Sequence, residues 1–126
     1  MAAKNGAPAK DSKGATNQAR GRWGEVQAAV WYERRGCVVL DRNWRCDRGE
    51  LDLVVADGDV MVFVEVKARA SDTFGTASAA VGERKQRTLR MLAARWLGDH
   101  PDRRGDIRFD VVAITGTCVE VIHHAF

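Results

Sequence analysis

The chain has 126 residues, of which 45% are hydrophobic, and it carries a formal net charge of +3 and three cysteines. This length suits one domain, since domains commonly need on the order of 100–150 residues. An odd cysteine count without a Cys-x-x-Cys pair argues against a disulfide framework and a zinc knuckle. No stretch approaches the roughly 20 apolar residues of a membrane span. We therefore expect a cytoplasmic protein with free thiols and no membrane partner.

Residues 1–20 account for the net charge, with four basic side chains and one acidic side chain. They show no apolar periodicity and lack the apolar core of a signal peptide. We expect a disordered basic tail over 1–20 and one folded domain over 21–126. Because that domain is neutral overall, bulk charge argues only weakly for a nucleic-acid partner.

Apolar periodicity and turn residues divide the domain into seven elements. Helical spacing of apolar side chains ends at Gly36 and again at Gly98, and glycine is common at helix C-termini. Asp57-Gly58 lies between two extended runs and is typical of a tight hairpin turn. The expected elements are a helix over 21–35, strands over 37–40, 49–56 and 60–68 with a polar loop over 41–48, a helix over 78–97, and strands over 107–115 and 119–122. The order α-β-β-β-α-β-β predicts an α/β fold.

Acidic side chains lie on both strands of the expected hairpin. Glu50 and Asp52 alternate with leucines and so share one face. If Asp57 and Gly58 form a two-residue loop, Glu50 faces Glu65, and Asp52 lies diagonally from Glu65 at about 7–8 Å between Cα atoms. Like charges across a ladder destabilise a sheet, and a divalent cation would compensate. Carboxylate oxygens favour Mg²⁺ or Mn²⁺, with Glu50 as an accessory group.

Lys67 follows Glu65 by two residues and would lie beside such a cation. Its charge could position water and stabilise negative charge on phosphate. A Glu-x-Lys motif alone more often marks a solvated strand face with a cross-strand ion pair. The hairpin context favours the metal site over that alternative.

Several motifs in the domain resemble those of the YraN family. They are Arg22-Trp-Gly-Glu25, Gly49-Glu-Leu-Asp52-Leu, Phe63-Val-Glu-Val-Lys67-Ala-Arg69 and Arg108-Phe-Asp110. The resemblance covers residues 21–126. It implies a restriction-endonuclease-like fold of the PD-(D/E)xK nuclease superfamily, similar to archaeal Holliday-junction resolvases. Such a fold is a three-layer sandwich in which helices flank a mixed central sheet.

The same resemblance implies roles for residues of the hairpin. Asp52 would be the first carboxylate of the signature, Glu65 the second and Lys67 its lysine. The backbone carbonyl of Val66 would be a further metal ligand. Leu51 stands where the signature has proline, so the motif is degenerate at its first letter.

Glu25 precedes Ala28, Ala29 and Tyr32 on a helical stripe that should face the sheet. In one interpretation Glu25 is an additional metal or water ligand and so a member of the catalytic group. In the other it is a helix-start carboxylate that the helix macrodipole stabilises. The sequence leaves both open.

The second helix carries basic residues that could meet nucleic acid. Lys85 and Gln86 should point towards the site, Lys85 as a phosphate ligand and Gln86 as an accessory group. A basic strip on the same helix consists of Arg84, Arg87, Arg90 and Arg95. It predicts contact with phosphates, although a solvated helix face looks much the same.

Three further features receive an interpretation. Trp44 lies in a polar segment and is the tryptophan best placed to stack on a base. Arg108 and Asp110 predict a structural ion pair rather than a metal site. We assign no role to His123 and His124.

Together these patterns predict a metal-dependent endonuclease that hydrolyses phosphodiester bonds in DNA, with branched DNA as a candidate substrate and Mg²⁺ or Mn²⁺ as cofactor. A C₂ homodimer would suit an enzyme that cuts two strands. Two alternatives stay open: a non-catalytic nucleic-acid-binding module on the same fold, and a protein-interaction domain whose hairpin charges form only a salt-bridge network.

Overall fold

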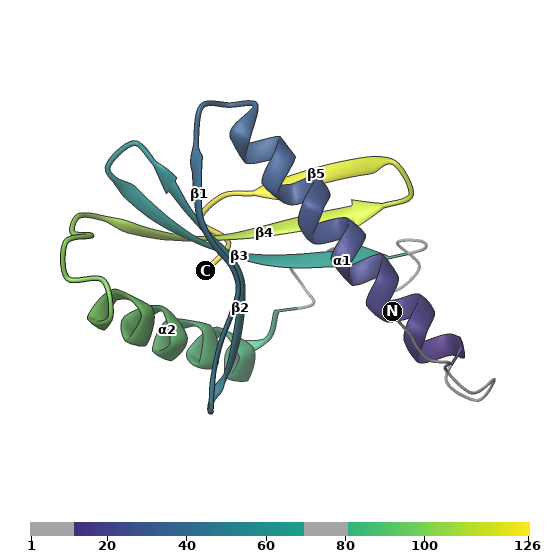
Figure 1. Cartoon of the computed structure of the whole chain (residues 1–126), viewed down its shortest axis with the longest axis horizontal. Helices are drawn as coiled ribbons and strands as arrows, with labels where there is room; N and C mark the ends of the chain where they lie inside the picture. The colour runs from purple at the N-terminus through teal and green to yellow at the C-terminus, as the bar shows by residue number, and fades with distance from the viewer. Residues whose placement is uncertain (1–11, 70–80) are drawn as a thin grey trace, which may run out of the picture.

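Five strands form one mixed sheet with a helix against each face (Figure 1). The computed structural model describes residues 12–69 and 81–126, with side chains described from residue 19 onward. The elements are α1 (Ser12–Glu33), β1 (Val38–Cys46), β2 (Gly49–Asp57), β3 (Val60–Arg69), α2 (Glu83–Gly98), β4 (Ile107–Thr115) and β5 (Cys118–Ile122). This order confirms the predicted α/β fold class.

The strands lie in the order β1-β2-β3-β4-β5, and each pairs with its neighbour in the chain. All pairs are antiparallel except β3 and β4, which are parallel. A parallel pair needs a crossover connection, and α2 lies in that connection. The sheet is therefore mixed and sits between two helices, which is the three-layer arrangement that the family resemblance implied.

The central strands bury apolar side chains on both faces. Along β3, Met61 and Phe63 belong to the cluster that α2 covers, whereas Val62 and Val64 belong to the cluster that α1 covers. A strand covered on both faces reads as a continuous apolar run, as β3 does. The α1 stripe of Ala28, Ala29 and Tyr32 is fully buried, which confirms that this side of α1 faces the sheet.

Helix α1 begins at Ser12, so it crosses the domain boundary that we placed between residues 20 and 21. Apolar periodicity reveals only the part of a helix that packs on a core, whereas a nucleated helix continues through residues of good propensity, here alanine, glutamine and lysine. Residues 12–20 of the predicted tail therefore lie in α1, and residues 1–11 lie outside the described part. Although α1 has 22 residues, no helix in the described ranges is long and apolar enough to cross a membrane.

Strand β1 extends to Cys46 and includes most of the segment predicted as a loop over 41–48. It is an edge strand that pairs only with β2, so polar side chains such as Arg42 point to solvent without cost. A register shift between Val39 and Asp41 interrupts its pairing. Trp44 packs against the core cluster under α2, which argues against a stacking role.

The β2–β3 turn is displaced by one residue from the prediction. Asp57 pairs with Val60, so the loop residues are Gly58 and Asp59, and Gly58 has a φ of +59°. A positive φ at the first loop position favours glycine there. The predicted pairing of Glu50 with Glu65 is therefore wrong, because the observed register pairs Leu53 with Val64.

Gly24 lets α1 approach β3 closely. A Cβ atom at this position would lie 2.9 Å from the Cβ of Ala68 and 3.4 Å from a methyl of Val66. We expect Gly24→Val to lower the free energy of unfolding by about 1–3 kcal/mol, as overpacking does. In Gly21→Val, the matched control on the same helix, the new Cβ meets nothing within 4 Å, so the change should stay within about 0.5 kcal/mol. Urea denaturation measures both, and equal stabilities would contradict the close approach.

Candidate active site

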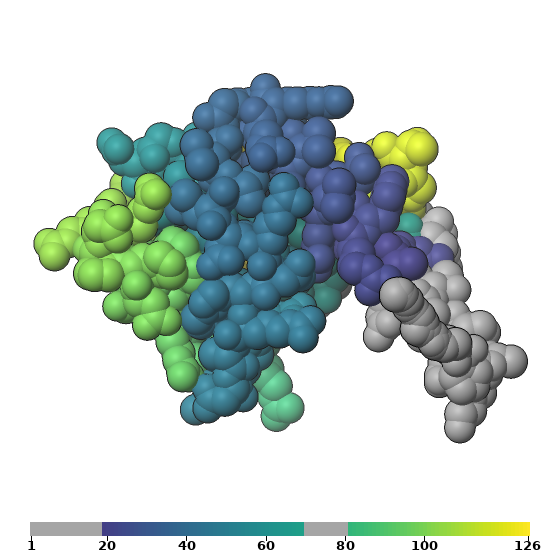
Figure 2. Space-filling view, viewed as in Figure 1, coloured from purple at the N-terminus to yellow at the C-terminus, as the bar shows by residue number. Residues whose placement is uncertain are grey.

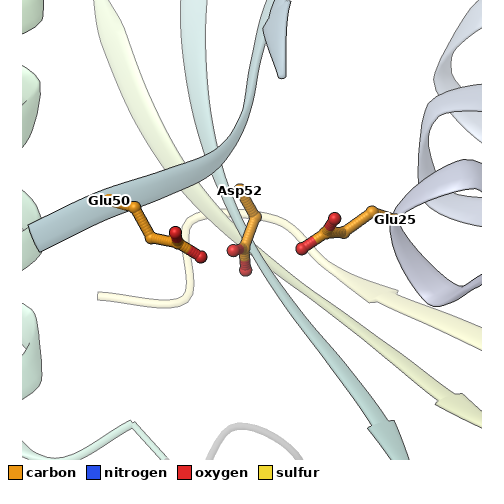
Figure 3. A group of neighbouring side chains, drawn as sticks. All are labelled: Glu25, Glu50 and Asp52. Carbon is orange, nitrogen blue, oxygen red and sulfur yellow. The ribbon is translucent and has the colours of Figure 1, made fainter. Parts of the chain in front are cut away.

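Three carboxylates from two elements converge beside the sheet. Glu25 comes from α1, and Glu50 and Asp52 come from β2. One carboxylate oxygen of each lies within 4.8 Å of the others, and Figure 3 shows all three groups pointing toward one another. Oxygens at 2.0–2.6 Å from a shared cation can lie at most about 4–5 Å apart, so these carboxylates fit a hard divalent cation. The structure thus brings Glu25 and Glu50 to Asp52.

Asp52 lies where β2 and β3 cease to pair. The ladder ends at Leu53 and Val64, and the Asp52 carboxylate accepts a hydrogen bond of 2.9 Å from the backbone N–H of Val66. The register continued by one residue sets Asp52 across from Glu65 rather than diagonally from it. The N–H and C=O groups of a strand residue point to the same neighbouring strand, so the Val66 carbonyl is directed to the Asp52 side as well.

Burial and like charge act together on Asp52. Burial, followed by the nearby charge of Glu65, raises the pKa of Asp52 to about 8, although the Val66 N–H opposes this shift. Burial also raises the pKa of Glu25, while hydrogen bonds from Asn43 and from Asp52 oppose the rise. Without a cation, the site therefore holds a proton on Asp52 near neutral pH. A metal ion would displace that proton.

Glu65 meets two lysines through one oxygen. Its Oε2 lies 3.2 Å from Lys67 Nζ and 3.4 Å from Lys85 Nζ. The Glu65 side chain is only 6% exposed, whereas the lysines keep 35% and 45% of theirs exposed. Lys85 reaches the site from the first turn of α2, as its position in the helix predicted. The acidic cluster is thus flanked by positive charge on its β3 side.

The other residues of α2 lie elsewhere. The Gln86 side chain donates a hydrogen bond of 3.0 Å to the carbonyl of Val81, which lies just before the start of α2, so this amide group is directed to the backbone rather than to the carboxylates. Arg90 lies over the rings of Phe109 and Phe126, with its Cζ at 5.1 and 5.4 Å from their centroids. Arg84 and Arg87 are exposed. Nucleic-acid contact therefore stays a prediction for Arg84, Lys85, Arg87 and Arg90, of which Arg90 also lies over two aromatic rings.

Two polar residues of β1 belong to the site, although the sequence analysis did not single them out. Arg45 Nε lies 2.8 Å from Glu50 Oε2, and the Asn43 side chain forms a hydrogen bond with Glu25. Asn43 has a φ of +52°, in the left-handed region that asparagine tolerates better than most residues. The loop prediction over 41–48 concealed them, because a loop has no defined face. An Asn-x-Arg pair on a strand next to Glu50 and Asp52 would have been the signal.

A cavity of about 550 Å³ opens beside the carboxylates. Its lining consists of Gly21, Arg22, Glu25, Asn43, Arg45 and Glu50. Figure 2 shows the face on which the residues of α1 lie next to those of β1 and β2. Two carboxylates of the cluster and two arginines therefore share one cavity.

A second polar network lies under α1. Asp110 is fully buried and accepts hydrogen bonds from Tyr32 at 2.7 Å and from Arg108 at 2.9 Å, and it lies 2.8 Å from His123 Nδ1. Burial alone would raise the pKa of Asp110, but the bonds to Arg108, Tyr32 and His123 lower it. The predicted ion pair of Arg108 and Asp110 is confirmed. His123, which we left without a role, joins it and ties the C-terminal segment to β4.

Comparisons with known proteins identify the family. Residues 24–114 match the model of the "Uncharacterised protein family UPF0102", a YraN-like family. A UPF0102 protein of Frankia alni is 50% identical over 97 residues, which are 77% of this chain and 81% of the relative. A UPF0102 protein of Pelotomaculum thermopropionicum is 48% identical over 94 residues, 75% of this chain and 78% of the relative. This chain, with its carboxylate cluster between α1 and β2, therefore belongs to the UPF0102 family.

Proposed function

We propose that this protein is a divalent-metal-dependent nuclease that hydrolyses phosphodiester bonds in DNA. The observation that carries the proposal is the convergence of Glu25, Glu50 and Asp52 within 4.8 Å, next to the two lysines on Glu65. Carboxylates bind the cation and lysines meet the phosphate in such chemistry. A place in the PD-(D/E)xK superfamily belongs to the same proposal, and the mixed three-layer fold and the hairpin site support it.

The donor set suits Mg²⁺ or Mn²⁺. The cluster offers oxygen ligands, whereas zinc sites usually enlist histidine or cysteine. Asp52, Glu25 and Glu50 would hold the ion, with Glu65 and the Val66 carbonyl on its β3 side. A bound cation would supply Lewis-acid charge that favours attack of water on phosphorus.

The lysines have a separate task. Lys67 and Lys85 bring two positive charges to one edge of the carboxylate cluster, where each lies within 3.4 Å of Glu65 Oε2. A preorganised positive group is most useful where negative charge develops on the pentacovalent phosphate. Lys67 also orients the attacking water in this proposal. Its half-buried position on β3 and its ion pair with Glu65 limit how far it can move.

Binding of the nucleic-acid backbone falls to exposed arginines of α2. We expect the double variant Arg84→Gln/Arg87→Gln to weaken DNA binding without changing which DNA structure is preferred, because phosphate contacts carry no sequence information. The slope of log affinity against log salt should fall by about 2, roughly one per lost contact. Arg103→Gln/Arg104→Gln, in the loop after α2, is the control of equal charge. If both double variants bind alike, α2 is a solvated face.

Calorimetric titration with Mn²⁺, followed by DNA binding with and without Mn²⁺, tests the proposal. We expect the protein to bind Mn²⁺ and to bind DNA more tightly in its presence. DNA binding of equal affinity with and without Mn²⁺ would instead favour a non-catalytic binding module. If the protein binds neither Mn²⁺ nor DNA, the hairpin charges form only a salt-bridge network. A C₂ homodimer and a cytoplasmic location are further parts of this proposal.

A further inference from the structure

Each outer carboxylate of the cluster has an arginine nearby, and these four residues line one cavity. Arg45 pairs with Glu50 at 2.8 Å, and the charge of Arg22 acts on Glu25. Both arginines line the cavity of about 550 Å³ together with these two carboxylates. The Arg45 side chain is 75% exposed, so the ion pair holds it in place without burying it.

Of the two arginines, Arg45 has a direct ion pair, with Glu50. A divalent cation on the carboxylates would take over the neutralisation of Glu50, so the guanidinium group of Arg45 would become available to another anion beside Arg22. A guanidinium binds phosphate oxygens in a bidentate manner, and this suits a cavity open to solvent. A volume of about 550 Å³ lies within the range of pockets that hold small ligands, roughly 300–1,000 Å³.

We propose that this cavity is a backbone-phosphate subsite, in which Arg22 and Arg45 hold a phosphate next to the one that is cleaved. The inference rests on the proposed function, since it assigns the cation to Glu25, Glu50 and Asp52. The subsite fills only after the cation has released Arg45 from Glu50. Metal and nucleotide therefore bind cooperatively, and by linkage each strengthens the other by the same factor.

The test uses thymidine 5′-phosphate, which carries a phosphate but has no phosphodiester bond to cleave. Calorimetry measures its affinity with and without saturating Mn²⁺, for the parent protein, Arg45→Gln, Arg22→Gln and the control Arg42→Gln. Arg42 is exposed on the same strand and is not among the residues that line the cavity. For the parent and Arg42→Gln we expect Mn²⁺ to raise nucleotide affinity at least about fivefold, the lower range of allosteric coupling. Arg45→Gln and Arg22→Gln should lose most of this gain.

The affinity for Mn²⁺ alone separates a phosphate ligand from a structural residue. Arg45→Gln removes the group that competes with the cation for Glu50, so this variant should bind Mn²⁺ as tightly as the parent or more tightly. Weaker Mn²⁺ binding together with a lower melting temperature would make Arg45 structural and overturn the inference. If Mn²⁺ raised the nucleotide affinity of Arg45→Gln and Arg22→Gln as much as that of the parent, this inference would also be overturned, and the proposed function would stand. A parent that binds no Mn²⁺ would overturn both.

Discussion

Asp52→Asn is expected to stabilise the metal-free protein at pH 8 and to remove most of the stabilisation that Mn²⁺ produces. Burial and the charge of Glu65 raise the pKa of Asp52 from its ordinary value of 3.8 to about 8. The asparagine side chain can still accept the Val66 N–H, so the change removes charge at nearly constant shape. Each pKa unit corresponds to about 1.4 kcal/mol, so we expect the melting temperature at pH 8 to rise by at least about 4 °C.

The pH dependence follows from the same shift. Between pH 4 and pH 8 the unfolded chain has lost the Asp52 proton, whereas the folded protein still holds it. Stability of the metal-free parent should therefore fall as the pH rises through this window and should level off above about pH 8. In Asp52→Asn this loss should be much smaller. Asp59→Asn, in the exposed β2–β3 turn, is the control and should follow the parent.

Thermal unfolding at several pH values, with and without Mn²⁺, measures both effects. Binding of a ligand to the folded state alone raises its stability, and weaker binding reduces that gain. If Asp52→Asn has the melting temperature of the parent at pH 8 and the same rise in melting temperature with Mn²⁺, Asp52 is not a metal ligand.

Lys67→Ala is expected to lower the rate of metal-dependent cleavage by a factor of about 10²–10³, the usual cost of losing a group that stabilises the transition state. The fold should survive, because Lys85 still lies 3.4 Å from Glu65 Oε2 and keeps the buried carboxylate paired. Lys67 is not a cation ligand, so the rise in melting temperature with Mn²⁺ should match that of the parent. The defect should appear in kcat rather than in DNA affinity.

Single-turnover cleavage and a Mn²⁺ thermal-shift series on the same preparation separate these effects. Lys85→Ala is the natural comparison, since it removes the other lysine of Glu65 from an exposed position on α2. We expect it to weaken DNA binding more than the chemical step. Parent-like cleavage by Lys67→Ala would assign the lysine to a salt bridge only.

The parts of the fold that bury apolar side chains could be predicted from the sequence. The α1 stripe at Ala28, Ala29 and Tyr32, and the limits of β4, follow from periodicity, because burial is what periodicity records. The early turns of α1 and the outer half of β1 show no apolar periodicity, because the first is a helix extension and the second is part of an exposed edge strand. The hydrogen bonds of β1 depend on β2, which a local sequence window does not contain, whereas the first turns of α1 extend a helix that is stabilised by packing further along the chain.

The candidate site shows the same division. Asp52, Glu65, Lys67 and Lys85 could be placed together because alternation on strands and spacing on a helix fix their faces. The pairing register of β2 and β3 could not be predicted, because a turn at Asp57-Gly58 and a turn at Gly58-Asp59 both place glycine in the loop. The sequence could not decide between a ligand role and a helix-start role for Glu25, because this depends on how closely α1 approaches β2. In the structure this approach brings the Glu25 carboxylate into the cluster.

The most direct measurement is a cleavage assay over a panel of branched, flapped, single-stranded and duplex DNAs with Mg²⁺ and Mn²⁺. Parent protein, Asp52→Asn and Lys67→Ala should be compared in parallel, with EDTA added to matched samples. We predict cleavage of at least one substrate by the parent, none in EDTA, none above background by Asp52→Asn, and a rate about 10²–10³ lower by Lys67→Ala. Cleavage by both variants at the parent rate, or no cleavage of any DNA by a parent that also binds no metal, would contradict this prediction.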